Sequence, residues 1–295
     1  MLRTLAIAAT AAFCATTVFA NDVTITTNTT EATVPAQPSA VAVFDMAALD
    51  MLDALKVEGL TSTSNTYLPY LSSYTSEIGT LFEPDFEALN AAAPDLIVAG
   101  GRSSTKVEML SKIAPTVDMT MFGDNLIGQA RERLTSYGKV FGKSAEAEAL
   151  IAKLDAEIDA TKAAVAGKGN ALILLTNGGK LSAYGAGGRF GWVHQELELP
   201  IVLEGLKDTT HGESISFEFV REANPDWILV LDRAAAIGAE GEGAEVTLDN
   251  AIIADTNAAK NDRIVHLNSG GFYIASGGIQ STLETLSIIK TAFGG

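Results

Sequence analysis

Apolar and polar positions in this chain alternate between short apolar runs and longer stretches with helical spacing. The apolar runs predict buried strands at residues 41–44, 95–99, 116–121, 171–175, 227–231 and 263–267. Apolar residues three or four positions apart predict helices at residues 46–56, 107–113, 126–165 and 276–292. Residues 21–38 are expected to form a leading strand or an arm, and residues 59–74 a loop region. Strands that alternate with helices predict an α/β fold.

One segment of this pattern occurs twice. Residues 86–102 read FEALNAAAPDLIVAGGR and residues 217–233 read FEFVREANPDWILVLDR, which align without a gap and share seven identities. Each copy predicts a short helix that begins at Phe-Glu and stops at Pro-Asp, then a buried strand that ends on Arg102 or Arg233. The repeat therefore predicts two similar lobes that face a shared anionic ligand.

The longest helical stretch divides the chain between these lobes. A break at residues 141–144 predicts two helices, and the second has apolar residues at helical spacing with no turn until Gly167. This second helix is long enough to join two lobes as one rigid strut, which predicts limited closure. The expected organisation is a signal peptide at 1–20, an N-terminal lobe at 21–143, an inter-lobe helix at 144–167 and a C-terminal lobe at 168–295.

The first 20 residues have the pattern of an export signal. Arg3 gives a positive start, residues 5–13 are apolar, and small residues precede a cleavage site after Ala20. Cys14, the only cysteine, lies within this segment and follows the bulky Phe13, so we expect no lipid anchor and no disulfide. No later segment is long and apolar enough to span a bilayer.

The charge balance limits the possible partners. The formal net charge is −16, and loss of Arg3 leaves 19 basic against 36 acidic residues. Such an acidic chain is not expected to bind nucleic acid, and most of its carboxylates are expected to form a solvated surface. A cluster of arginines would be a local exception.

Three arginines are the first candidates for a binding site. Arg102 and Arg233 follow the repeated strands, and ligands of α/β lobes bind beyond the carboxyl ends of strands. Arg189 lies in AGGRFG, where glycines allow close approach of the backbone. A single arginine is most often a surface ion-pair partner, but guanidinium groups on three such loops favour binding of a strongly anionic ligand.

Two further pairs of residues are candidates for other roles. His211 and Tyr273 lie in glycine-rich loops, and imidazole and phenolate are suitable ligands for Fe(III), although such residues more often serve packing or hydrogen bonding. Glu87 and Glu218 begin the repeated helices, where a carboxylate favours the helix dipole. Each repeated helix runs back against its strand, so both glutamates are also expected on the rims of the lobes, near the cleft mouth.

These features resemble the periplasmic binding proteins of the vitamin B12 and ferric-siderophore importers. The second half resembles the subgroup that binds ferric catecholate siderophores, through the segments TNGGKLSAYGAGGRFGWVHQEL (176–197), THGESISFEF (210–219), NPDWILVLDRAAAIG (224–238) and NSGGFYIASGG (268–278). The similarity covers essentially the whole mature chain, and the first half carries only features general to the family.

The resemblance implies two Rossmann-like lobes joined by a single long α-helix, the class III periplasmic binding protein fold. It implies a periplasmic monomer without an intrinsic cofactor, whose cargo is an Fe(III)-siderophore and whose partner is the permease of an ABC importer. Arg102, Arg189 and Arg233 would bind the cargo. Tyr184, just ahead of the AGGRFG loop, is a further candidate to line the cleft and pack on a catechol ring, and ordinary partial burial is the alternative.

In the same subgroup, residues at the positions of His211 and Tyr273 complete the iron shell when a siderophore supplies only four donor atoms. The resemblance also assigns Glu87 and Glu218 to docking on arginines of the permease.

Other cargoes and other classes of protein would need different residues. Haem, cobalamin and hydroxamate siderophores remain alternative cargoes, although three arginines disfavour a neutral complex. A zinc or manganese carrier would need clustered histidines and carboxylates, and the three histidines are scattered. A secreted hydrolase would need a catalytic motif, and the sequence contains neither G-x-S-x-G nor H-E-x-x-H. We therefore do not expect an enzyme.

Overall fold

The computed structural model describes residues 22–28, 30–123, 125–206 and 211–294. The expected signal peptide, with Cys14 and the cleavage site after Ala20, lies outside the described residues. Among the helices that are described, none combines the length and the apolar character needed to cross a membrane.

The first half of the chain forms a four-stranded parallel sheet preceded by a hairpin. The hairpin pairs β1 (Asp22–Thr26) with β2 (Glu31–Pro35). The sheet has the order β4-β3-β5-β6. Its strands are β3 (Val41–Val43), β4 (Leu60–Ser62), β5 (Leu96–Ala99) and β6 (Thr116–Asp118).

The second half forms a five-stranded sheet with the order β11-β10-β7-β8-β9. Strands β7, β10 and β11 are parallel, β8 is antiparallel to β7, and β9 is antiparallel to β8. The strands are β7 (Ala171–Asn177), β8 (Lys180–Tyr184), β9 (Glu213–Ile215), β10 (Trp227–Asp232) and β11 (Ile264–His266). The repeated strands β5 and β10 each lie second to one edge of their sheet, in equivalent positions.

Helices cover both sheets and connect them. Those of the first half are α1 (Met46–Ala54), η1 (Pro69–Tyr74), α2 (Phe86–Ala92), η2 (Gly101–Lys106), α3 (Val107–Leu110) and α4 (Leu126–Val140). The connecting helix is α5 (Ser144–Val165). Those of the second half are α6 (Trp192–Leu197), α7 (Phe217–Ala223), α8 (Arg233–Ile237), α9 (Ala244–Leu248), α10 (Ala251–Ala254), α11 (Asn257–Lys260), η3 (Gly270–Ile274) and α12 (Ile279–Gly294).

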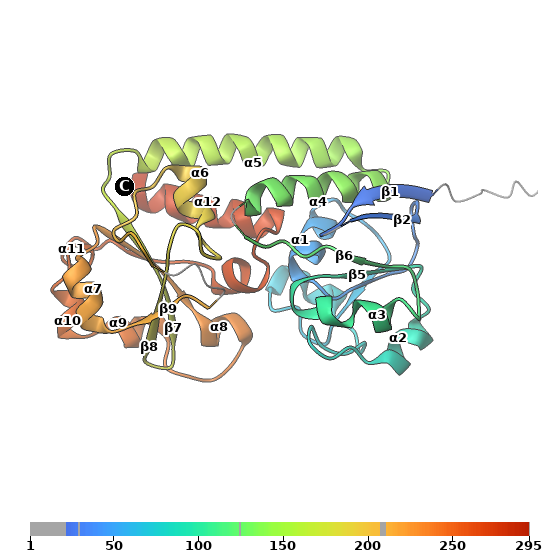
Figure 1. The fold of residues 1–295 in the computed structure, drawn as a ribbon, viewed down its shortest axis with the longest axis horizontal. Helices are drawn as coiled ribbons and strands as arrows, with labels where there is room; N and C mark the ends of the chain where they lie inside the picture. Colours follow the sequence, from blue (N-terminus) through green and yellow to red (C-terminus); the bar gives the residue numbers. More distant parts are fainter. Residues whose placement is uncertain (1–21, 29, 124, 207–210, 295) are drawn as a thin grey trace, which may run out of the picture.

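The long helix α5 extends across both halves, as Figure 1 shows, with α4 beside it over the first half and α12 over the second. Its buried face includes Leu154, Ile158 and Val165, which pack into one apolar core with residues of α4 and α12. The core is therefore continuous between the lobes, and the expected two-lobed α/β fold with a single long helix is confirmed.

The repeated Pro-Asp pair has a structural explanation. The carboxylate of Asp95 accepts hydrogen bonds from the backbone N–H groups of Ser39 and Ala40, at 2.9 and 3.0 Å, just before β3. In the second copy, the carboxylate of Asp226 accepts the N–H of Asn170 at 3.0 Å, just before β7. Each aspartate thus joins the start of its own strand to the start of the neighbouring strand, β3 in the first copy and β7 in the second. This contact explains why both copies keep the aspartate.

A second contact joins the lobes directly. The carboxylate of Asp50, on α1, accepts hydrogen bonds from the backbone N–H groups of Gln280 and Ser281 at 2.8 and 3.0 Å. These are the free N–H groups at the start of α12, so a side chain of the first half caps a helix of the second. Tyr70 donates its hydroxyl to the same carboxylate at 2.6 Å. Asp50 has no exposed surface.

Several short elements differ from the sequence-based expectation. The stretch expected as a loop at residues 59–74 contains β4 and η1, and the helix expected at 107–113 ends at Leu110. Strands β8 and β9 were not predicted, because they are short and no apolar run marks them in the sequence.

Candidate ligand-binding site

The two repeated arginines follow the carboxyl ends of equivalent strands. Arg102 lies in η2, just after β5, and Arg233 begins α8, directly after β10. Asp232 caps α8 by accepting the N–H of Ala235 at 3.1 Å. The backbone N–H of Asp232 donates to the hydroxyl of Ser269 at 2.8 Å, which fixes the Arg233 turn to the segment that leads into η3.

Stacked aromatic rings position the third arginine. Arg189 precedes Phe190, which is fully buried and stacks on Phe272 with ring centroids 4.5 Å apart. Because Phe272 is the neighbour of Tyr273 in η3, this stack brings the AGGRFG loop against the Tyr273 loop. The ring stack could not be predicted from the sequence, since it joins segments 82 residues apart, whereas the Asp232 cap is a local contact that the sequence analysis missed.

The three arginines converge on Tyr273. Arg189 donates from Nη2 to the backbone oxygen of Tyr273, and its Cζ lies 4.5 Å from the centre of the Tyr273 ring. Arg102 reaches across from the first half and donates to the same oxygen at 3.4 Å, with its Cζ 5.4 Å from the ring. Arg233 hydrogen-bonds the Tyr273 side chain. The structure therefore brings together four of the predicted site residues: Arg102, Arg189, Arg233 and Tyr273.

The electrostatics of this cluster favour a negative charge. Burial acts to raise the pKa of Tyr273, but Arg189, the hydrogen bond from Arg233 and the charge of Arg102 outweigh it and hold this pKa below its usual value. Burial, together with the charge of Arg102, lowers the pKa of Arg189. Several positive charges are thus held close together at the cost of mutual repulsion.

The described part of the chain offsets these charges little: Asp45 interacts with the charge of Arg102 but forms no salt bridge with it. Among the described residues, the salt bridges do not include Arg102, Arg189 or Arg233. Guanidinium groups without anionic partners offer forked hydrogen-bond donors to an incoming anion.

Tyr184 lies against Gly212, the residue that follows His211. His211 is exposed, and the described hydrogen bonds and ring contacts do not join it to Tyr273. Gly212, with a φ of 73°, lies so close to the Tyr184 ring that a Cβ atom there would come within 3.0 Å of it. Tyr184 is 1% exposed, and burial raises its pKa to about 12. In this arrangement the Tyr184 ring packs against Gly212, next to His211, and is not exposed to solvent.

Glu87 and Glu218 are both exposed in the first turns of α2 and α7. The preceding residues cap these helices: Asp85 accepts the N–H groups of Glu87 and Ala88 at 3.0 and 2.9 Å, and Ser216 accepts the N–H of Phe219 at 3.2 Å. Helix capping therefore does not require the two glutamates. Hydrogen bonds from its own backbone N–H and from Ser216 lower the pKa of Glu218.

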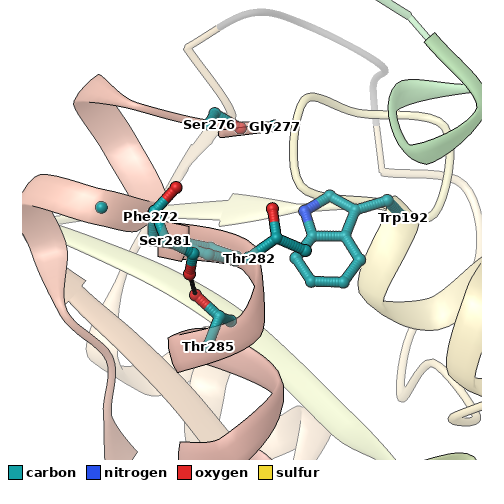
Figure 2. A pocket seen from close by; sticks show the side chains of 8 residues that line it. Trp192, Phe272, Ser276, Gly277, Ser281, Thr282 and Thr285 are labelled. Carbon is teal, nitrogen blue, oxygen red and sulfur yellow. Dashed lines mark hydrogen bonds between the residues drawn. The ribbon is translucent and has the colours of Figure 1, made fainter. Parts of the chain in front are cut away.

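A small cavity of about 10 Å³ lies behind the Tyr273 loop, with room for about one water molecule. Figure 2 shows the Trp192 indole facing Thr282 across it, with Ser281 and Thr285 hydrogen-bonded beside them. Phe272 also lines this cavity and packs 6.1 Å from the Trp192 ring. This cavity is too small for a siderophore. Trp192 and Phe272 both line it, so Trp192 lies close to the Tyr273 loop.

No group of three or more His, Cys, Asp or Glu side chains that could hold a metal ion occurs in the part of the chain that the structure describes. The charge pattern of the site suits an anion, and iron would enter as part of that anion.

Two lobes joined by one long helix, with cations from both lobes meeting between them, define a two-lobed solute-binding protein. The family model for periplasmic binding proteins matches residues 41–270, and the chain belongs to this family.

Several relatives share most of its length. The petrobactin-binding protein YclQ of Bacillus subtilis is 32% identical over 264 residues, which are 87% of this chain and 83% of the relative. The crystal structure of the periplasmic catecholate-siderophore binding protein VctP from Vibrio cholerae superposes with a TM-score of 0.84 at 32% identity, covering 92% of this chain and 100% of that one. A TroA-like periplasmic binding protein from Xylanimonas cellulosilytica has 40% identity and a TM-score of 0.81, covering 89% and 91%.

Proposed function

We propose that this protein captures an Fe(III)-catecholate siderophore between its two lobes and delivers it to the permease of an ABC importer. The observation that carries this proposal is the meeting of Arg102, Arg189 and Arg233 around Tyr273, outside the salt bridges of the described residues. A ferric tris-catecholate carries about three negative charges, which guanidinium groups stabilise by charge-assisted hydrogen bonds. The names of YclQ and VctP, a petrobactin-binding and a catecholate-siderophore binding protein, support the same class of cargo.

Tyr273 and His211 are proposed to ligate iron when the siderophore supplies only four donor atoms. The lowered pKa of Tyr273 supports this role, because the phenolate is the form that binds Fe(III). His211 is exposed on a loop held against Tyr184, so it is accessible to a ligand. Tyr184 is proposed to act on the cargo through this loop.

We further propose that the chain is exported by cleavage after Ala20 and works as a periplasmic monomer without catalysis. The proposed lobes comprise residues 21–143 and 168–295, with residues 144–167 as the inter-lobe helix. Glu87 and Glu218 are proposed to dock on basic residues of the permease, which is supported by their exposure and by the independent capping of α2 and α7.

Tryptophan fluorescence tests the central proposal. Trp192 is 4% exposed and lies close to Phe272, so an iron-catecholate chromophore beside Tyr273 should quench its emission. The purified protein is titrated with the ferric complex of a tetradentate bis-catecholate, and calorimetry on the same samples measures the affinity. The Trp192→Phe variant should lose most of the quenching and keep the heat of binding. Absence of both quenching and heat at micromolar ligand would refute the proposal.

A further inference from the structure

The loop that follows β6 is held firmly by helix α4. The Gln129 side chain brackets Phe122: its Oε1 accepts the N–H of Phe122 at 3.0 Å, and its Nε2 donates to the carbonyl oxygen of Phe122 at 2.7 Å. A side-chain amide that pairs with both backbone groups of one residue fixes the direction of the chain at that residue.

Arg133, one turn further along α4, holds the residues just before. Its Nε donates to the carbonyl oxygen of Met119 and its Nη2 to that of Thr120, both at 3.4 Å. Arg133 is 2% exposed, so a buried cation serves this loop. Side chains of α4 thus pair with the backbone groups of Met119, Thr120 and Phe122, which favours a preformed loop.

The loop lies at the boundary between the lobes, next to the arginine site. Thr120 accepts the N–H of Gly101 at 2.8 Å, and Gly101 is the neighbour of Arg102. On the other side, Met121 packs against Gly277 of the second lobe, where an added Cβ atom would come within 2.7 Å of the Met121 methyl group. Phe122 therefore lies in the loop that follows β6, the strand next to β5, and two residues after Thr120, which contacts the neighbour of Arg102.

Phe122 itself is 64% exposed. Leaving an aromatic ring in water on a braced loop forgoes the stabilisation that its burial would provide. A ligand ring that covers it would recover that stabilisation without ordering the loop first.

We infer that Phe122 is an apolar contact for an aromatic ring of the cargo and contributes to selection of aryl-bearing siderophores. This inference rests on the proposed function, since it requires a catecholate in the cleft. The arginines would bind the charge that all anionic iron chelates share, whereas Phe122 would recognise the ring that distinguishes catecholates from aliphatic chelates.

Substitution of Phe122 tests the inference. Calorimetric titration with a ferric bis-catecholate should show that Phe122→Ala weakens binding about ten-fold, whereas Phe122→Trp, which keeps an aromatic face, stays within about two-fold of the wild type. Phe82→Ala is the matched control, because Phe82 is 54% exposed on another loop of the same lobe, and it should leave the affinity unchanged. Unchanged thermal unfolding of the three variants would show that folding is intact.

The outcomes separate this inference from the proposed function. If the wild type binds the complex and Phe122→Ala binds it equally well, Phe122 does not contact the cargo and the proposed function stands. If Phe122→Trp loses as much affinity as Phe122→Ala, the aromatic contact is refuted. If binding persists in Phe122→Ala while uptake in cells is lost, Phe122 serves the permease and the inference is wrong. If the wild type binds no ferric catecholate, both ideas fail together.

Discussion

Tyr273 is the residue on which the two lobes and the three arginines meet. Its backbone oxygen receives Arg102 and Arg189, and its side chain receives Arg233. These contacts also keep the arginines in place while no anion is bound. A cargo that brings its own oxygen atoms would replace the tyrosine carbonyl as the acceptor, so the site is organised before binding.

Removal of Arg233 should weaken cargo binding without affecting the fold. Arg233→Ala deletes one charge-assisted contact, and we expect a loss of one to two powers of ten in affinity for a ferric catecholate, about 1.4 to 3 kcal/mol. Calorimetry measures it. Arg263→Ala is the control, because Arg263 packs over Trp227, 5.0 Å from its ring, away from the cluster. Equal losses in both variants would place the cleft elsewhere.

Direct iron ligation by Tyr273 and His211 predicts a spectroscopic difference between two kinds of cargo. Tyr273→Phe and His211→Ala should shift or bleach the charge-transfer band of a tetradentate complex, because iron then lacks donor atoms. The same variants should leave the band of a hexadentate complex nearly unchanged. Absorption spectra of the four combinations decide the matter, and equal effects on both kinds of cargo would exclude ligation.

The sequence predicted the arginine positions well for a simple physical reason. Each arginine follows the carboxyl end of its repeated strand, where ligands of α/β lobes bind, so the repeat predicted that Arg102 and Arg233 face each other from the two sheets. Tyr184 was expected at the surface of the cleft and is buried, because the approach of Gly212 covers its ring. Such coverage depends on packing between loops, which periodicity cannot reveal.

Among the elements, helix α12 is unusual in how it begins. Its first N–H groups are capped by Asp50 of the other lobe, and Gln280 also donates from Nε2 to Asp53 at 2.8 Å. The sequence predicted both helices but not their connection, since Asp50 sits mid-helix where a polar residue usually faces solvent. Long helices such as α5 were predicted within a few residues, whereas β4 was missed because its sequence, LTS, holds a single apolar residue and no apolar run.

The Asp50 cap predicts a particular pH dependence of stability. Burial raises the pKa of Asp50 to about 6, although hydrogen bonds from Tyr70, Gln280 and Ser281 oppose the shift, and the charge of Asp53 adds to it. The folded protein then binds a proton more tightly than the unfolded chain. The contribution of this tighter proton binding to the free energy of unfolding is fully present below the unfolded pKa near 3.8. It is lost as the pH rises through about 6.

Urea denaturation between pH 4 and pH 8 measures this effect. The free energy of unfolding of the wild type, relative to Asp50→Asn, should fall by up to about 3 kcal/mol as the pH rises across this range. Asp50→Asn removes the titrating group and keeps much of the shape of the side chain. A difference that stays constant with pH, or that grows as the pH rises, would contradict a raised pKa for Asp50.

At the scale of the whole molecule, the lobes are held together by a spine of helices. Helix α5 packs on α4 of the first lobe and α12 of the second, and Asp50 adds a buried link from α1 to α12. A connection of this kind resists large hinge motion, so lobe closure is expected to be small. The permease would then recognise the loaded protein through surfaces whose spacing is nearly fixed.

With the spacing of the lobes nearly fixed, the proposed docking role of Glu87 and Glu218 can be tested separately from cargo binding. Glu87 and Glu218 belong to helices in different lobes, α2 and α7, seen toward the outer parts of the two lobes in Figure 1. The double variant Glu87→Ala with Glu218→Ala should reduce siderophore-dependent uptake to background in cells, because two anionic contacts with the permease are lost together. Calorimetry should show unchanged cargo affinity, since neither carboxylate is among the contacts of the arginine cluster.

A matched double variant controls for charge alone. Glu108 and Glu245 are also exposed and also lie in the first turns of helices, α3 and α9, one in each half. Glu108→Ala with Glu245→Ala removes the same net charge and should leave uptake intact. If both double variants reduce uptake equally, general electrostatic attraction and not a specific pair of contacts directs docking. If the Glu87 and Glu218 variant also loses cargo affinity, the two functions are coupled, and a docking role separate from binding is wrong.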